Sequence, residues 1–211
     1  MATGTQGLPR PGPGLRKGAR TRARILDAAE RCFAEKGFAG ASLREIAAAA
    51  GIREPGLYNH FAGKRALYAA VLDRALQPLA TLLERAIQGS RERATFADLP
   101  GDITDLLARR PRVSALFQQA LQGGSGAEAA GLLDRWLDRL FAQGMAASRS
   151  SGRPERDRAE VAIGVIAMFN LCTGYFLSQR AFDRMAEGSL GAPENLVRQK
   201  RLLSRMVRAV V

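Results

Sequence analysis

Apolar residues recur three and four positions apart along most of the chain after residue 20, a spacing that places them on one face of an α-helix. The first such face contains Ile25, Ala29, Cys32 and Phe33, and a longer one begins near Lys64. No stretch of the sequence alternates convincingly between apolar and polar residues, as a half-buried strand would. Glycine and proline residues separate the periodic segments, which predicts an all-α fold with helices at about 19–36, 42–50, 53–61, 64 onward, 95–109, 111–122, 127–147, 155–184 and 194–209.

The charge of the chain is strongly positive and is concentrated near the amino terminus. Of 211 residues, 32 are Lys or Arg and 20 are Asp or Glu, which gives a net charge of +12. Residues 1–65 carry 12 basic and 5 acidic side chains. This balance favours anionic partners such as nucleic acid or an acidic membrane surface. Residues 1–17 are rich in glycine and proline and are expected to form a flexible basic tail, which either contacts DNA or only aids solubility.

The cysteines and the apolar segments indicate a protein of the reducing cytoplasm. Cys32 and Cys172 lie far apart in apolar surroundings and are expected to be free thiols. The sequence starts without the apolar segment of a secretory signal. The apolar run at residues 161–177 is barely long enough to span a membrane and contains Asn170 and Thr173, so a buried helix of a soluble protein is the favoured interpretation. No membrane partner is expected.

Two short predicted helices are joined by a tight turn between residues 42 and 61. Ser42 lies three residues before Glu45, which is the spacing of a capping box, and Gly51 ends this helix. Pro55 falls in the first turn of the next helix, where proline is tolerated. The arrangement is typical of a helix-turn-helix, whose second helix enters the major groove while side chains around it bind phosphates.

Residues 20–68 resemble the DNA-binding domain of the TetR family of bacterial transcriptional regulators. The resemblance rests on "ILDAAERCFAEKGFAGASLREIAAAAGI" followed by "LYNHFAGKRALY", which match the family's apolar face, helix end, cap, turn and aromatic–cationic signature in register. It implies a helix-turn-helix domain at residues 18–65 and a larger helical domain for effector binding and dimerisation at residues 66–211. It also implies binding to double-stranded, palindromic operator DNA and no enzymatic activity.

The resemblance assigns DNA contacts to five residues in the two short helices and just after them. Tyr58, His60 and Lys64 match positions that grip phosphates, and Lys64 also lies at a helix start, where the helix dipole favours an anion. Ser42 matches a phosphate-contacting hydroxyl and also fits the role of a helix cap. Arg44 matches a position that can reach a base, where a guanidinium can read guanine.

Five further residues are the expected edge that reads the bases: Arg53, Glu54, Pro55, Gly56 and Asn59. The chain departs from the common family pattern here. Arg53 stands where serine is usual, Glu54 places an acid against a polyanion, and Gly56 replaces a frequent Thr or Ser. Glu54 could accept from cytosine N4 or pair with Arg53. Gly56 allows close approach of the backbone. The departures leave the operator sequence open.

Structural alternatives apply to the aromatic and histidine residues of this stretch. Phe61 is better explained as a core aromatic, and Tyr58 could be one as well. A catalytic or metal-binding role for His60 is disfavoured, because the sequence contains no second histidine and no cysteine pair at ligand spacing. No metal and no cofactor are expected.

The carboxy-terminal part is expected to be helical, and the resemblance implies that its last two predicted helices form a homodimer. Packing within the subunit's own core is the alternative. The apolar faces of these helices contain Val161, Val165, Met168, Phe169, Cys172 and Phe176 in the first, and Leu196, Leu203, Met206, Val207 and Val210 in the second.

The resemblance also implies an unidentified small-molecule effector that binds in the carboxy-terminal part. The expected function is a repressor that the effector releases from its operator. An activator or effector-independent regulator of the same fold is one alternative, and a helical small-molecule-binding protein without specific DNA binding is another. Candidate pocket residues are the large apolar and aromatic side chains of this part, namely Phe117, Trp136, Phe141, Met145, Met168, Phe169 and Tyr175.

Overall fold

The computed structural model describes residues 13–88, 94–122, 127–150 and 157–210, and every regular element in these ranges is a helix. The expected all-α fold is confirmed. The elements are α1 (Pro13–Gly40), α2 (Leu43–Ala49), α3 (Glu54–Tyr58), α4 (Lys64–Gln88), α5 (Ala94–Arg109), α6 (Arg112–Leu121), α7 (Ala127–Ser150), α8 (Arg158–Leu177), α9 (Gln179–Met185) and α10 (Pro193–Val210).

Helix boundaries differ from the sequence expectation in several places, and α3 ends at Tyr58 rather than at Phe61. Helix α1 begins at Pro13 rather than near residue 19, so residues 13–17 of the expected tail are helical, while residues 1–12 lie outside the described ranges. The expected stop at Gly37 is present as a break in the helical backbone, with φ 71°. The single helix expected at 155–184 is divided into α8 and α9 at Ser178.

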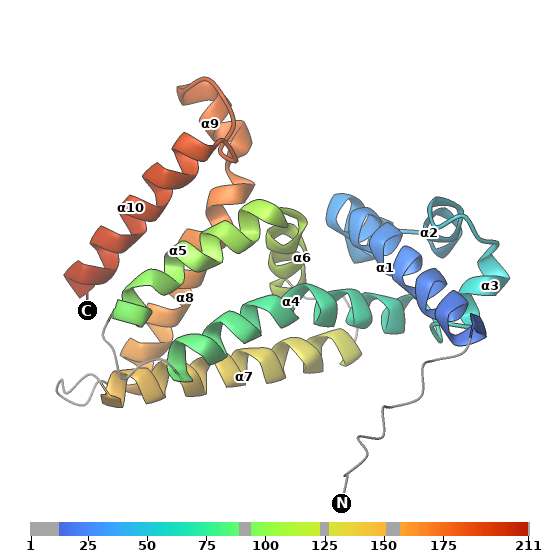
Figure 1. Ribbon diagram of the computed structural model, residues 1–211, viewed down its shortest axis with the longest axis horizontal. Coiled ribbons are helices and arrows are strands. Elements are labelled where there is room, and N and C mark those ends of the chain that lie inside the picture. Colours follow the sequence, from blue (N-terminus) through green and yellow to red (C-terminus); the bar gives the residue numbers. More distant parts are fainter. Residues whose placement is uncertain (1–12, 89–93, 123–126, 151–156, 211) are drawn as a thin grey trace, which may run out of the picture.

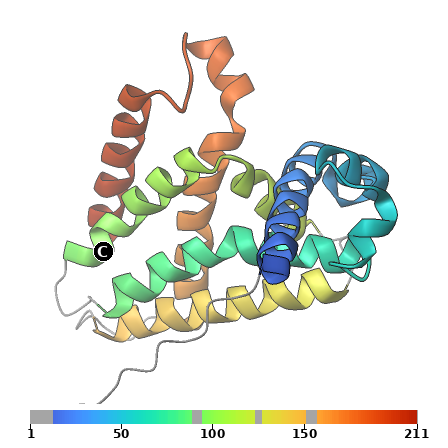
Figure 2. The same ribbon diagram turned by 45° about the vertical axis from the view of Figure 1, so that its right-hand side comes forward.

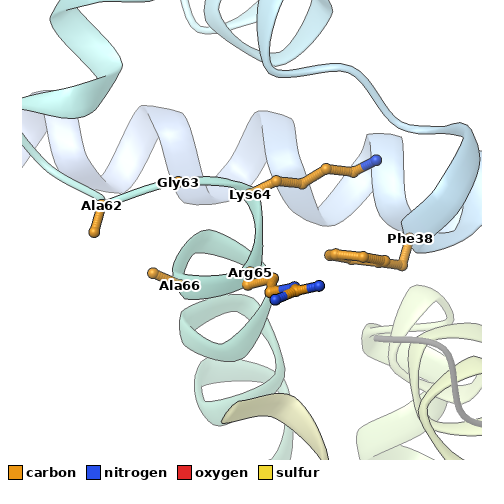
Figure 3. A pocket seen from close by; sticks show the side chains of 6 residues that line it. All are labelled: Phe38, Ala62, Gly63, Lys64, Arg65 and Ala66. Carbon is orange, nitrogen blue, oxygen red and sulfur yellow. The ribbon is translucent and has the colours of Figure 1, made fainter. Parts of the chain in front are cut away.

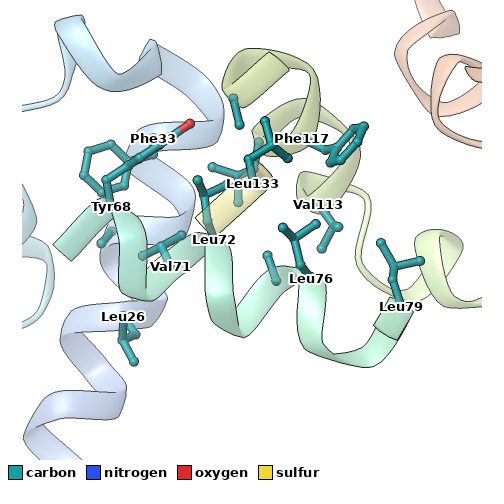
Figure 4. Packing of buried hydrophobic residues seen from close by; sticks show 14 of the residues in the cluster. Leu26, Phe33, Tyr68, Val71, Leu72, Leu76, Leu79, Val113, Phe117 and Leu133 are labelled. Carbon is teal, nitrogen blue, oxygen red and sulfur yellow. The ribbon is translucent and has the colours of Figure 1, made fainter. Parts of the chain in front are cut away.

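Helices α1, α2 and α3 form a unit at one end of the molecule, here called the head, and α4 leads from it into the larger body (Figure 1). The head has its own core, in which the side chains of Ile25, Phe33, Ile46 and Leu57 are completely buried. Tyr68 of α4 lies edge-on to Phe33, with ring centroids 4.9 Å apart, and joins this core to the body (Figure 4). Such pairs add to the stabilisation from burial of the rings.

In the body, α4 packs along α7, and α5 packs between α10 and α8 (Figures 1 and 2). Side chains from α4, α6 and α7 meet in one layer, where Leu72, Phe117 and Leu133 are buried together (Figure 4). Helix α6 also contacts α1, so the body touches the head through α6 as well as through α4. The apolar core is therefore continuous from the head into the body.

The contact between head and body contains a partly buried cluster of charges, here called the ionic joint. Arg74 of α4 donates to Asp27 at 2.7 Å and to Glu30 at 2.8 Å, both on α1. Glu30 also accepts from Arg110, which follows α5, at 3.4 Å. Arg110 further donates to the main-chain carbonyl of Arg74 at 3.4 Å. That carbonyl lacks its helical partner because Pro78, four residues later, has no N–H.

Helix α8 is apolar on all sides, and its length and composition would allow it to cross a membrane. The side chains of Phe169 and Cys172 are buried in the subunit's own core, so these two residues of the expected dimer face point inward. Ile163 and Ile166 are 66% and 58% exposed instead. On α10, Leu203 is likewise buried, while the exposed apolar side chains are Val197, Leu202 and Met206. The side chains of Val161, Val165, Val207 and Val210 lie outside those described.

Candidate nucleic-acid interface

The start of α2 is capped as the sequence predicts, but only by half of the expected motif. Ser42 has extended backbone angles, φ −116° and ψ 135°, and its hydroxyl accepts from the amide of Glu45 at 3.5 Å. The Glu45 carboxylate binds Lys36 of α1 at 3.0 Å instead of returning to the Ser42 amide. The hydrogen bond and the negative charge of Glu45 raise the pKa of Lys36. Both partners are about half exposed, so the pair contributes little to stability.

The turn between α2 and α3 depends on glycine and on an arginine from α1. Gly51 has φ 67°, which favours glycine over any residue with a side chain. Arg24 donates from Nη2 to the carbonyl of Ala50, and to the carbonyl of Gly51 at 3.4 Å. A Cβ at Gly51 would collide with this Nη2 atom. The turn is thus tied directly to α1.

Helix α3 is anchored by its apolar side and presents its polar side to solvent. Leu57 is completely buried and Phe61, just after the helix, is 6% exposed, as expected for core residues. The guanidinium of Arg22 lies over the Phe61 ring at 4.9 Å from its centroid. Tyr58 is 53% exposed, so its ring is not a core aromatic. The short helix is therefore held from one face only.

The residues expected to contact DNA bases lie on the free side of α2 and α3. The side chains of Arg44, Arg53, Pro55 and Asn59 are exposed, and that of Glu54 is partly exposed. In the described part of the chain, no side-chain hydrogen bond or ion pair engages any of them, so the alternative in which Glu54 pairs with Arg53 is not formed. Their donors and acceptors are available to a ligand.

Gly56 lies in the first turn of α3, and a Cβ built on it would meet no other atom within 4 Å. Its φ is not positive, unlike that of Gly51. Neither the backbone conformation nor the packing of the protein therefore requires glycine at this position. The missing side chain leaves the main chain of α3 accessible at the edge expected to read bases.

The residues expected to bind phosphates have different environments. His60 is half-buried, and Tyr58 points into solvent. The ammonium of Lys64 lies over the ring of Phe38, 4.8 Å from its centroid, and donates to the Ala39 carbonyl at 3.1 Å. Lys64 and Phe38 line an open hollow at the start of α4, together with Ala62, Gly63, Arg65 and Ala66 (Figure 3). An ammonium group has three donors, so Lys64 retains hydrogen atoms for an anion while it keeps these contacts.

Three of the seven candidate effector residues are brought together. Phe117 of α6, Trp136 of α7 and Phe169 of α8 form a buried aromatic cluster, with ring centroids 4.3 to 5.2 Å apart. Phe141 instead lies under the guanidinium of Arg158, 5.0 Å from it.

The remaining candidate effector residues are not part of this cluster. The Tyr175 hydroxyl donates to the Leu190 carbonyl at 2.8 Å and so ties α8 to the segment before α10. Met145 and Met168 are half-buried.

The described residues contain no group of three or more His, Cys, Asp or Glu side chains that could hold a metal ion. Both cysteines are free, and burial raises the pKa of the Cys172 thiol to about 12. Such a thiol is protonated near neutral pH and is a poor nucleophile.

A family model described as "Bacterial regulatory proteins, tetR family" matches residues 25–71, which include the second half of α1, the capped α2, the turn, α3 and the start of α4. Over these residues the chain is similar to this family. The match covers the interface described above and ends within α4, so the likeness is to the helix-turn-helix part of the chain.

Two relatives and one solved structure are similar to this chain over different lengths. The transcriptional activator FasR of Mycolicibacterium smegmatis is 38% identical over 88 residues, 39% of this chain and 40% of FasR. The transcriptional repressor Rv1474c of Mycobacterium tuberculosis is 36% identical over 67 residues, 32% of this chain and 36% of its own. The chain thus aligns with less than half of these relatives. FadR of Bacillus subtilis, solved with stearoyl-CoA, has the same fold over 88% of this chain and 96% of its own, with a TM-score of 0.66 and 16% identity.

Sequence reasoning missed the residues that support the interface from behind. Arg22 and Arg24 belong to the basic amino-terminal segment that suggested DNA contacts, yet both are engaged with the head itself. No spacing rule could have found these contacts, because the Arg24 partners are main-chain carbonyls 26 and 27 residues away. The ionic joint was missed for the same reason, since Glu30 and Arg110 are 80 residues apart.

Proposed function

We propose that this TetR-family protein is a cytoplasmic, dimeric transcriptional regulator, most simply a repressor, that binds palindromic operator DNA and is released by a small-molecule effector. The observation that carries the proposal is the free polar side of α3, whose Arg53, Glu54 and Asn59 face solvent while Leu57 fixes the helix from behind. A helix of this kind fits the major groove, where its first residues reach base edges. The activity is binding rather than catalysis.

Dimerisation is supported by the apolar residues that α8 and α10 leave exposed. Ile163, Ile166 and Leu177 of α8, with Val197 and Leu202 of α10, are between 46% and 66% exposed. A soluble monomer rarely leaves a patch of this kind uncovered. A second copy would cover it through the same residues on both sides, as twofold symmetry requires. Two α3 helices could then occupy successive major-groove faces about 34–36 Å apart. Sedimentation equilibrium tests this, and a monomer at micromolar concentration would contradict it.

Effector release needs a connection from the body to α3, and the ionic joint is the connection we propose. Glu30 on α1 binds Arg74 on α4 and Arg110 before α6, so a shift of either body helix changes the contacts of the head. An effector that binds better to a shifted body would misplace the two α3 helices and weaken DNA binding.

Salt-dependent binding to DNA tests the proposed function. Fragments of the host genome that the protein retains should bind more tightly than a random duplex of the same length, and footprinting should reveal an inverted repeat. Lys64→Ala should weaken binding to all sequences and lower the salt slope by about 0.9, the effect of one phosphate contact. Arg44→Ala should instead relax discrimination at one base step by roughly 1–3 kcal/mol. Equal binding to random DNA would leave only the helical small-molecule-binding alternative.

The direction of regulation is tested in cells. FasR is named an activator and Rv1474c a repressor, so likeness to these relatives does not choose between the two. We favour repression because occupation of an operator is itself sufficient to exclude other proteins from the site. Deletion of the gene should raise the transcripts next to the bound sites, and a fall would support the activator alternative.

Acyl-CoA esters are the first effector class to test, because FadR of Bacillus subtilis was solved with stearoyl-CoA. In this chain, the packed rings of Phe117, Trp136 and Phe169 are the apolar groups between α6, α7 and α8 that we propose an acyl chain would contact on displacing them from one another. Stearoyl-CoA should release the protein from its DNA, while CoA alone should not. Release by neither would exclude this class and leave the DNA-binding function intact.

A further inference from the structure

Arg24 is the residue through which α1 reaches the turn of the helix-turn-helix. Its Nη2 atom donates to the carbonyls of Ala50 and Gly51, which lie at the carboxy-terminal end of α2. The last carbonyls of a helix have no partner within the helix, and a positive charge there is favourable. The guanidinium therefore satisfies main-chain groups that the short helix α2 cannot satisfy itself.

The residue at position 51 is compatible with this contact only if it is glycine. Its φ of 67° favours glycine, and a Cβ would occupy the space taken by the Arg24 Nη2 atom. Arg24 and Gly51 thus form one unit, in which the missing side chain admits the arginine and the arginine holds the turn. The turn leads directly to Arg53, the residue at the N-cap position of α3.

A second arginine of α1 holds the other end of α3. Arg22 lies over the ring of Phe61, which follows α3 and is buried. Helix α3 is only five residues long, so few internal hydrogen bonds fix its direction. Its orientation is set by what holds its two ends, and both ends are attached to the same turn of α1.

We infer that Arg24 is a positioning residue for DNA recognition, which fixes the α2–α3 turn and so aims α3, rather than a residue that binds a phosphate. This inference rests on the proposed DNA-binding function. The basic side chains near the amino terminus then have two different roles. Arg22 and Arg24 serve the head, while Lys17 and Arg20 are exposed and have no side-chain hydrogen bond or ion pair with the described residues, so they are available to the polyanion.

The first test measures the turn without DNA. Amide hydrogen exchange of the segment 46–57 is followed in the wild type, Arg24→Met and Arg24→Lys. Arg31→Met is the matched control, because Arg31 lies two turns further along α1, is exposed, and its loss changes the charge equally. Exchange in this segment should rise about fivefold or more in both Arg24 variants and stay unchanged in the control. Unchanged exchange in Arg24→Met would overturn the inference, whatever the DNA binding shows.

The second test separates positioning from phosphate binding. Affinity for a retained genomic duplex and for a random duplex is measured by fluorescence anisotropy at several salt concentrations. Arg24→Met should weaken specific binding about tenfold, with the salt slope unchanged, and Arg24→Lys should not restore it, because lysine is one bond shorter and cannot place its ammonium where Nη2 lies. A slope lower by about 0.9, equal weakening on random DNA and rescue by lysine would identify a phosphate contact and overturn the inference.

The two tests also distinguish failure of the inference from failure of the proposed function. If the wild type bound no DNA specifically, the proposed function would be wrong, while the exchange experiment would still decide whether Arg24 holds the turn. Near-identical helix content and melting temperature in the two Arg24 variants and the control would establish that all three are folded.

Discussion

Substitution of Gly56 by alanine should stabilise the protein and weaken its DNA binding. A Cβ at this position meets no atom within 4 Å, and the backbone is that of an ordinary right-handed helix, so alanine fits without strain. Alanine in a helix is favoured over glycine by roughly 0.5–1 kcal/mol, chiefly because glycine loses more backbone freedom on folding. The free energy of unfolding should rise by about that amount.

The effect on DNA binding has the opposite sign because the added methyl group points away from the protein. If the backbone of α3 approaches the duplex closely at Gly56, the methyl group should cost roughly 1–3 kcal/mol of specific affinity, the range of one mismatched base pair. Chemical unfolding and anisotropy on the same preparations measure both quantities. Gly131→Ala in α7 is the control, since its Cβ would meet only a flexible arginine at 3.5 Å. It should stabilise the protein and leave DNA binding unchanged. Undiminished affinity of Gly56→Ala would refute close approach at this position.

Two further predictions concern the joint and the thiols. Glu30→Gln should lower the free energy of unfolding by about 1–3 kcal/mol, less than for a fully buried pair because its arginine partners are 27% and 30% exposed. Glu84→Gln, which breaks the surface pair of Glu84 with Arg139, should cost less than about 1 kcal/mol. Equal losses of the two variants in urea titrations would contradict this difference. The raised pKa of about 12 keeps Cys172 protonated, so at pH 8 a thiol reagent should modify Cys32 first and Cys172 only on unfolding. The neutral Cys172 thiol contributes stability fully below about pH 9, and this contribution should be lost as the pH rises toward 12. In melting curves recorded at alkaline pH, Cys172→Ala should remove this part of the pH dependence.

The features that the sequence predicted well are those set by neighbouring residues. The start of α2 at Ser42, the turn at Gly51 and the tolerance of Pro55 in the first turn of α3 all depend on groups within four residues of each other. Such local rules follow from hydrogen bonding and backbone sterics, so they apply before any tertiary contact forms.

The features that could not be predicted from the sequence are set by distant parts of the chain. Helix α8 is apolar all round, so its periodicity could not tell that Phe169 turns inward while Ile166 faces solvent. Its division from α9 at Ser178 is also tertiary, since the Gln179 side chain binds the amide of Leu190 in the segment before α10. Tertiary packing overrides local pattern wherever more than one face could be buried.

One side of α3 packs against the head and the other faces solvent. This separation affects how specificity for DNA sequence can change. Leu57 is completely buried, and the turn before it is tied to Arg24, so substitutions there would cost stability. Arg53 and Asn59 are exposed and engaged by no described side-chain contact, so exchanging them should cost the fold little, because surface substitutions away from specific contacts change stability by less than about 0.5 kcal/mol. The operator that this protein reads can therefore differ from that of its relatives while the scaffold behind α3 stays the same.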